Sequence, residues 1–503
     1  MLLYGLRWSL KYQSVLFENK HIFLLNDFLN IFTATHNLKE SIAMNTKKMI
    51  LAAVFFSMAS SLLVFPQAKA WHETGEQKAQ RMEWWTHDRF GMFIHWGLYA
   101  LPARHEWIQL YEKIPADKYR VYFDQFDPDL YNPKEWAAKA KQAGMKYVVL
   151  TTKHHEGFCL WDTRYTDYKV TNTPYGKDLL KPFVDAFRAE GIRIGFYYSL
   201  IDWHHPHFAF DRSHPPVPTD LEERKKTNEK RDMGIYRQYM KDQLTELLTQ
   251  FGQIDELFMD FSYPGEGGKG HEDWDSEGLA RLARELQPQI IINNRLDLED
   301  TDWSWDYITP EQFMPQEWPT VNGKRVPWET CQTFSGSWGY YRDQYTWKST
   351  HQLIVMLIET VSKGGNLLLN VGPTARGVFE DRANERLDGI GDWMRFNSRS
   401  IYGCTQAPNE YGIPQNCLMT YNPNTHRLYI HILEWPFKSL HLPGMKDKVK
   451  YAQLLQDASE IKFYSHTQSG SHTVETSKEN DLILALPVER PATEVPVIEL
   501  ILK

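Results

Sequence analysis

Short apolar segments alternate with amphipathic segments from residue 88 to residue 372, and this alternation constrains the fold more than any other feature. Apolar residues at helical spacing predict helices, and short apolar runs that end in polar residues predict buried strands. The expected strands are residues 89–97, 145–155, 192–200, 254–261, 289–295 and 366–372. The expected helices are residues 133–144, 179–191, 233–252, 276–288, 346–365 and 382–403. Strands and helices in this order form a parallel sheet covered by helices.

Two parallel architectures compete, and the sequence favours a barrel. A Rossmann sheet needs a glycine-rich phosphate loop after its first strand, and residues 98–132 contain none. A (β/α)8-like barrel fits the number of repeats. After residue 403 the pattern changes to short alternating strands around an Asn-Pro-Asn turn. We therefore predict an α/β protein with a (β/α)8-like catalytic domain at residues 71–403 and a C-terminal antiparallel β-sandwich at residues 404–503.

The beginning of the chain has the features of an export signal. Residues 44–70 contain two lysines, an apolar run and an Ala-Lys-Ala cleavage site before Trp71. A transmembrane anchor is the alternative, but the apolar run is short and interrupted by serines. Residues 1–43 are then expected to be an upstream mis-start outside the fold. We expect export to a periplasm, or secretion beyond it, and no membrane span once the signal is removed.

Composition narrows the range of partners. The net charge of −8 disfavours a general nucleic-acid or anionic-membrane binder. The four cysteines show no Cys-x-x-Cys spacing, which argues against a structural zinc site. Cys404 and Cys417 are the only pair close in sequence, and their pairing stays open. No metal or cofactor is expected. The chain has 18 Trp residues, a type of side chain that stacks on the apolar face of sugars.

Five expected strands end in polar or aromatic side chains. These are His95-Trp96, His154-His155, Tyr197-Tyr198, Asp260 and Asn294-Arg295. In a parallel barrel such ends meet on one face, where active sites are built. One interpretation is a divalent metal site of histidines and Asp260, which the single histidine of the first strand disfavours. The other is glycoside hydrolysis, which needs two carboxyl groups and neutral hydrogen-bonding groups around the sugar.

Several segments together resemble a known enzyme family. They are "FGMFIHWG", "HEW", "TTKHHEGFCLW", "GFYYSLIDW", "NNR", "TPEQ", "WETCQTFSGSWGY" and "GGNLLLNVGPTARG". In this order, over residues 80–403, the chain resembles the glycoside hydrolase family 29 α-L-fucosidases. The resemblance implies a retaining exo-α-L-fucosidase that releases terminal fucose from fucosylated oligosaccharides or glycoconjugates by double displacement. It also implies the same barrel and β-sandwich.

The resemblance assigns catalytic residues. It makes Asp260 the nucleophile, and Asp255 is disfavoured because it precedes the strand. The family usually has glycine after this aspartate, whereas this chain has Phe261-Ser262-Tyr263. The general acid/base is expected to be Glu311, with Glu329 as the alternative; Glu317 is a further candidate.

The resemblance also assigns the residues that bind fucose, with Tyr197 preferred over Tyr198. They are His95, Glu106, Trp107, His154, His155, Tyr197, Arg295 and Trp338. A fucose-binding lectin on the same scaffold is the non-catalytic alternative; it would not need the carboxylates.

Overall fold

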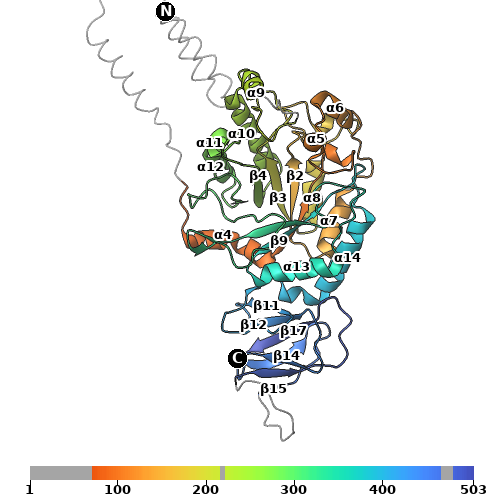
Figure 1. Cartoon of the computed structure of the whole chain (residues 1–503), viewed down its shortest axis with the longest axis vertical. Coiled ribbons are helices and arrows are strands. Elements are labelled where there is room, and N and C mark those ends of the chain that lie inside the picture. The colour runs from red at the N-terminus through yellow and green to blue at the C-terminus, as the bar shows by residue number, and fades with distance from the viewer. Residues whose placement is uncertain (1–70, 216–220, 466–479) are drawn as a thin grey trace, which may run out of the picture. The chain divides into compact units, whose positions relative to one another are not determined.

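The computed structural model describes residues 71–215, 221–465 and 480–503. The expected mis-start at residues 1–43 and the expected signal peptide at residues 44–70 lie outside these ranges. Figure 1 shows a parallel sheet surrounded by helices and followed by smaller antiparallel sheets. In the part of the chain that is described, no helix has the length and apolar character needed to span a bilayer.

Seven parallel strands form the central sheet; six of them coincide with expected strands, and β8 is an addition to the sequence-based expectations. Their order is β5-β4-β3-β2-β1-β9-β8, and every neighbouring pair is parallel. Their bounds are β1 Phe90–Ile94, β2 Tyr147–Lys153, β3 Arg193–Ser199, β4 Glu256–Asp260, β5 Ile291–Ile292, β8 Glu329–Thr333 and β9 Asn366–Val371. The prediction of a (β/α)8-like fold is confirmed.

An irregular eighth segment, residues 307–311, lies between the two edge strands. Tyr307 forms a parallel bridge with Asn293 just after β5, and Glu311 forms a parallel bridge with Cys331 of β8. The segment therefore joins the edges of the sheet and completes the ring. Because it runs parallel to the strands, Glu311 lies at the same end of the barrel as the other carboxyl ends.

Helices cover the outside of the sheet, and side-chain caps explain where several of them begin. Asn132, Asp232, Asp275 and Ser349 each accept a hydrogen bond from a backbone N–H of the first turn of the helix that follows. These helices are α7 Pro133–Gln142, α10 Met233–Gln250, α12 Ser276–Leu286 and α13 Thr350–Ser362. Two more expected helices are α8 Leu180–Ala189 and α14 Asp381–Asn397. Helices beyond the sequence-based expectations are α4 Gly75–Asp88, α5 Ile108–Tyr111, α6 Ala116–Asp124, α9 Leu221–Asn228 and α11 His271–Trp274.

Helix α4 closes the N-terminal end of the barrel. Its Met82 and Trp85 are buried in one cluster with inward-facing residues of the strands, among them Phe93 and Phe258. Asn366, the first residue of β9, donates a hydrogen bond from Nδ2 to the Trp85 carbonyl at 2.8 Å. With this end filled by buried side chains, the opposite end of the barrel remains for a binding site.

Two antiparallel sheets follow the barrel, as predicted for a β-sandwich. One has the order β10-β11-β12-β17-β14 and the other β13-β16-β15. Their strands are β10 Thr405–Gln406, β11 Cys417–Asn422, β12 Arg427–Ile432, β13 Ser439–Leu442, β14 Val449–Leu454, β15 Phe463–Ser465, β16 Leu482–Ala485 and β17 Val497–Leu502. A shared apolar core that includes Leu428, Ile430 and Leu484 holds the sheets together. Because Trp71–Lys503 form one compact unit, the division at residue 403 stays a prediction.

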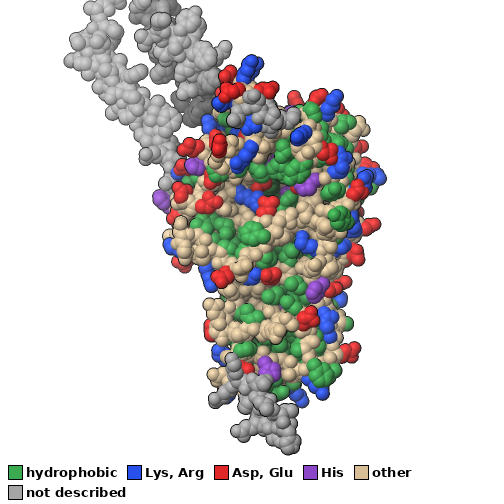
Figure 2. All heavy atoms as spheres, viewed as in Figure 1, with side chains coloured by type: hydrophobic (Ala, Val, Ile, Leu, Met, Phe, Trp, Pro, Cys, Tyr) green, Lys and Arg blue, Asp and Glu red, His purple; other side chains and the backbone are tan. Residues whose placement is uncertain are grey.

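Charged side chains of both signs are mixed over the surface. Figure 2 shows Lys and Arg interspersed with Asp and Glu over the visible face of the described residues, with no wide basic surface on it. A wide basic surface is the usual signature of nucleic-acid binding.

A short antiparallel pair, β6 Thr320–Val321 and β7 Lys324–Arg325, lies in the connection before β8.

Candidate active site

Polar side chains from five strand ends meet at the open end of the barrel. The rings of His95, His154 and Tyr197 lie 5.6–5.7 Å from one another, centroid to centroid. Asp260 is the last residue of β4, and Arg295 follows β5. The structure therefore brings these residues together, whereas Trp96 packs on Trp136 and Tyr198 hydrogen-bonds to Gln243 of α10, on the outer side of the sheet.

Asp260 is the most strongly held group of this cluster. Its Oδ2 accepts a hydrogen bond from the Tyr197 hydroxyl at 2.6 Å, and its Oδ1 lies 2.6 Å from Arg295 Nη1. His155 Nε2 lies 3.9 Å from Oδ2. Burial by itself would raise the pKa of Asp260, but the positive charge of Arg295 and the hydrogen bonds outweigh it and lower that pKa. Asp260 is therefore an ionised carboxylate at neutral pH.

Its rival Asp255 lies at the other end of the barrel. It pairs with Arg193 at 3.1 Å and accepts the backbone N–H of Ile194 at 3.0 Å, both at the start of β3. This carboxylate ties two strand beginnings together and does not face the cluster.

Buried neutral histidines surround the carboxylate. His95 Nδ1 lies 2.7 Å from Asn370 Oδ1, which is an acceptor, so Nδ1 carries the proton and Nε2 is free to accept. His155 Nδ1 donates in the same way to Ser199 Oγ at 2.7 Å, because that hydroxyl gives its own proton to the Ile201 carbonyl. Burial lowers the pKa of His95 to about 3 and that of His155 to about 4. Both rings are therefore neutral hydrogen-bonding groups at physiological pH.

Two buried polar atoms of the cluster have no hydrogen-bond partner among the described residues. They are His154 Nδ1 and Glu106 Oε1, and the latter lies 3.4 Å from His105 Nδ1. The other carboxylate oxygen of Glu106 accepts the backbone N–H groups of Trp338 and Gly339 at 3.1 and 2.9 Å. An unpaired buried polar atom is costly, so these two atoms indicate a ligand that carries hydroxyl groups.

Aromatic rings complete the wall around the histidines. Trp338 stacks on His95 with centroids 5.0 Å apart, and Trp107 meets His155 edge-on at 4.8 Å. Both indoles present apolar surface beside hydrogen-bonding groups, a combination that suits one sugar ring.

Glu311 reaches the same site from the eighth segment. Its side chain is 42% exposed, and its Oε2 lies 2.8 Å from Arg295 Nη1, the atom that also contacts Asp260. These two contacts limit the distance between the nearest oxygens of Asp260 and Glu311 to at most about 5.4 Å, which is shorter than the ~6.5–9.5 Å separation of inverting glycosidases. Both carboxylates line one cavity of about 340 Å³.

The alternative acid, Glu329, lies at the closed end of the barrel. It is the first residue of β8, is fully buried and accepts a hydrogen bond from the Tyr147 hydroxyl. A carboxyl group there cannot reach a ligand that contacts Asp260. The position of Glu329 at the start of β8 therefore contradicts the alternative prediction that Glu329 is the acid/base. Glu317 is exposed and is not part of the cavity that contains Asp260.

Sequence reasoning missed several residues of the site. Asn370 orients His95 from near the end of β9, and Ser199 orients His155 from the end of β3. The strand-end pattern applied to "LLLNVG" and "FYYSL" would have found both. Asp297 and Glu299, which line the cavity beside Glu311, lie in a loop that carries no such signal.

The metal interpretation finds no support in this geometry. Within residues 71–215, 221–465 and 480–503, no three His, Cys, Asp or Glu side chains are placed to hold one ion.

All four cysteines, including Cys404 and Cys417, are unpaired and buried.

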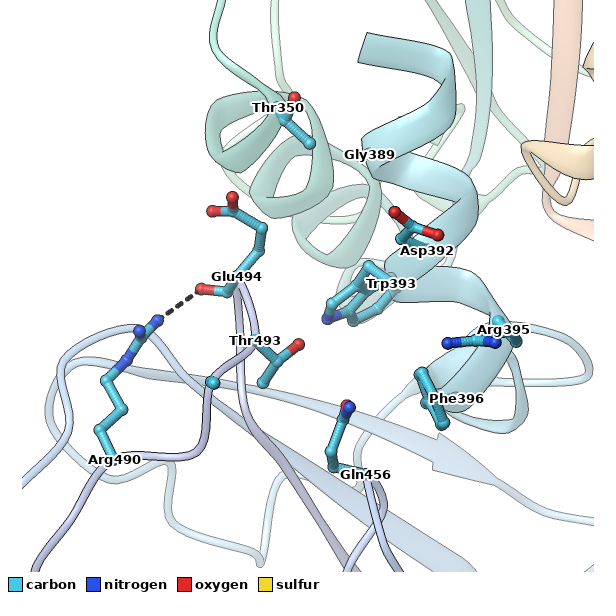
Figure 3. A pocket seen from close by; sticks show the side chains of 11 residues that line it. Thr350, Gly389, Asp392, Trp393, Arg395, Phe396, Gln456, Arg490, Thr493 and Glu494 are labelled. Atoms are coloured by element: carbon cyan, nitrogen blue, oxygen red, sulfur yellow. Dashed lines mark hydrogen bonds between the residues drawn. The ribbon is translucent and has the colours of Figure 1, made fainter. Parts of the chain in front are cut away.

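A larger cavity of about 630 Å³ lies elsewhere, between α14 and the loop before β17. Figure 3 shows Asp392 and Trp393 on the helix and Thr493 and Glu494 on the loop. None of the strand-end residues lines it. The volume of a cavity therefore does not identify the active site. The convergence of two carboxylates and Arg295 identifies it.

The sequence and the fold are similar to those of known proteins. A family model described as alpha-L-fucosidase matches residues 59–399, more than half of the chain. The plasma alpha-L-fucosidase of Homo sapiens is 30% identical over 413 residues, covering 76% of this chain and 82% of that protein.

Solved structures agree. Alpha-L-fucosidase isoenzyme 1 from Paenibacillus thiaminolyticus is 43% identical with a TM-score of 0.78, covering 85% of this chain and 99% of that one. A Bacteroides thetaiotaomicron alpha-L-fucosidase is 29% identical with a TM-score of 0.73, covering 87% of this chain and 99% of that one. It was trapped as a covalent intermediate with 2-fluoro-fucosyl fluoride in a glutamate-to-glutamine variant.

Proposed function

The chain belongs to the α-L-fucosidase family of glycoside hydrolases, and from this premise we propose a retaining exo-enzyme that uses double displacement. Its substrates are fucosylated oligosaccharides or glycoconjugates, from which it removes terminal α-L-fucose. The observation that carries the proposal is the pair of carboxylates, Asp260 and Glu311, that contact one nitrogen of Arg295.

In the first step, Asp260 attacks the anomeric carbon of the fucosyl unit and the bond to the leaving oxygen breaks. Protonated Glu311 gives its proton to that oxygen, so the leaving group departs as a neutral alcohol. Asp260 suits the nucleophilic role because Arg295 and Tyr197 keep it ionised although it is buried. Glu311 suits the acid role because its exposed side chain can turn between Arg295 and a leaving group in the cavity.

In the second step, ionised Glu311 takes a proton from a water molecule, and the resulting hydroxide attacks the same carbon. The bond to Asp260 breaks and fucose leaves with its original anomeric configuration. The trapped covalent intermediate of the B. thetaiotaomicron relative supports this route.

The neutral histidines and the aromatic rings beside Asp260 bind the sugar. His95 and His155 offer Nε2 acceptors, while Glu106 and His154 offer the unpartnered atoms that hydroxyl groups would satisfy. Trp338 provides a flat apolar surface for the methyl group of fucose. Trp107 and Tyr197 complete the enclosure.

The decisive experiment removes the nucleophile. Asp260→Gly should lose nearly all activity and regain part of it with azide, giving β-fucosyl azide as the product. Asp447→Gly is the matched control, since Asp447 is exposed in a sandwich turn with φ 62°, a conformation that glycine accepts. A fully active Asp260→Gly would remove Asp260 from the mechanism.

The acid/base assignment has its own test. Glu311→Ala should spare the first step for fucosides with good leaving groups and slow it strongly for poor ones, because only the poor ones need the proton. Glu317→Ala, at a nearby exposed glutamate, should retain both rates. Equal losses of Glu311→Ala on good and poor leaving groups contradict the role.

We also propose that the enzyme is exported, to a periplasm or beyond the cell, through the signal at residues 44–70. Expression of the chain from Met44 in a bacterium should give an exported protein whose first residue is Trp71. An unprocessed protein retained in the cytoplasm argues against export.

A further inference from the structure

The residue after the nucleophile has an unusual backbone conformation. Phe261 has φ 78°, in the left-handed region that residues with a side chain rarely adopt. Bulky aromatic residues are real outliers there, whereas glycine would adopt this conformation without strain. The surrounding structure must therefore hold Phe261 in place.

The loop that follows is held on several sides. Tyr263 and Lys269 exchange backbone hydrogen bonds at 2.8 and 3.1 Å, and both side chains donate to the carboxylate of buried Asp211. Trp274 Nε1 donates to Ser262 Oγ at 3.1 Å. These contacts explain how the chain tolerates the strain at Phe261.

The conformation changes the direction of the ring. Successive residues of an extended strand point to opposite faces, so Phe261 would point away from the site that Asp260 faces. Instead both residues line the same 340 Å³ cavity. The ring lies 4.9 Å from His155, 5.1 Å from Trp107 and 4.9 Å from Tyr263, centroid to centroid.

The same cavity is also lined by acidic side chains. It contains Asp297, Glu299 and Glu311, while its one cation, Arg295, already contacts Asp260. Asn294 Nδ2 donates to Glu299 at 2.8 Å, which keeps that carboxylate at the cavity wall. An aromatic face and carboxylate acceptors in one cavity suit a ring with an apolar face and outward hydroxyl groups, and the carboxylates repel an anion.

We propose that Phe261 forms the aromatic wall of the leaving-group subsite, and that this subsite selects an uncharged pyranose lying with its apolar face on that ring. Leaving groups that carry a carboxylate or sulfate on this sugar are disfavoured by the carboxylates that line the cavity. The inference rests on the proposed function, since the cavity is a leaving-group subsite only if Asp260 is the nucleophile.

The test compares substrates that do and do not touch the wall. Fucosyl fluoride has a leaving group too small to reach Phe261, whereas a neutral fucosyl-galactose disaccharide, in the linkage cleaved fastest, reaches it. Phe261→Leu keeps an apolar side chain without a flat face, and Phe261→Gly removes the side chain and relieves the strain. In both variants we expect kcat/KM for the disaccharide to fall by about three- to ten-fold more than kcat/KM for the fluoride.

Phe437→Ala is the control, since Phe437 is an aromatic residue that is 73% exposed in the sandwich, and it should change neither rate. Equal losses on both substrates would overturn the proposal, because Phe261 would then be supporting the fold. A wild-type enzyme that fails to hydrolyse fucosyl fluoride would instead contradict the proposed function.

The charge selection is measured with the same disaccharide carrying a sulfate on galactose. The wild-type enzyme should prefer the neutral form, and Glu299→Gln should reduce that preference. Equal cleavage of the neutral and sulfated forms by the wild-type enzyme would overturn the selection of an uncharged sugar.

Discussion

Two buried carboxyl groups face each other at the closed end of the barrel, and they should make the stability of the protein depend on pH. Glu256 begins β4 and Glu329 begins β8, and the charge of Glu256 acts on Glu329. Glu256 Oε2 and Glu329 Oε1 have no hydrogen-bond partner among the described residues. Burial of these oxygens favours the protonated, uncharged form of each carboxyl group.

Burial is the main cause that raises the pKa of both groups, to about 7 for Glu256 and well above the ordinary value for Glu329. The unfolded chain releases these protons near pH 4.5, whereas the folded protein keeps them to higher pH. The protonated pair therefore stabilises the folded protein fully below about pH 4.5, and this contribution to the free energy of unfolding is lost as the pH rises through about 7. For Glu256 alone the loss amounts to about 3 kcal/mol.

The perturbation is Glu256→Gln, which keeps the shape, can donate to Glu329 and can accept from the Tyr307 hydroxyl. Urea midpoints followed by tryptophan fluorescence at pH 5, 6, 7 and 8 are compared with those of the wild-type protein. The variant should lose less stability between pH 5 and pH 8. Glu317→Gln, at an exposed site, should follow the wild-type curve. Parallel curves for wild type and Glu256→Gln would refute the reasoning.

Three further predictions concern the site. Removing the guanidinium in Arg295→Met should raise the pKa of Asp260, so the acidic limb of the kcat/KM profile moves to higher pH; an unmoved limb contradicts the role of Arg295. Asn370→Leu removes the acceptor of the His95 Nδ1 proton, and kcat/KM should fall by about ten-fold, while a fall as large as that of Asp260→Gly would indicate misfolding. Incubation with a chelator should leave activity unchanged, since the mechanism uses no metal; a loss restored by a divalent cation would revive the metal interpretation.

The local pattern was sufficient for residues that end regular strands. Asp260, His95 and the His154-His155 pair each follow a short apolar run, and parallel packing brings all such ends to one face. That is why their convergence could be predicted without knowing a single long-range contact. The antiparallel sandwich followed in the same way from alternating residues and turn signals.

The choice between Glu311 and Glu329 depended on long-range closure instead. Residues 307–311 carry no strand pattern, and only their bridges to Asn293 and Cys331 place Glu311 at the open end. Glu329 lies at the start of its strand, and the structure places this strand start at the closed end of the barrel, as it does for Asp255.

The sequence by itself determined the strand–helix order and the side chains at the strand ends, because these depend on periodicity within a few neighbouring residues. The tertiary structure brought the expected Glu311 to Asp260, removed the alternative Glu329, and alone decided that Phe261 turns toward the nucleophile. These outcomes depend on contacts between segments far apart in the chain. Residues 307–311 form bridges that close the barrel, and Asp211 accepts hydrogen bonds from Tyr263 and Lys269 in the loop after β4.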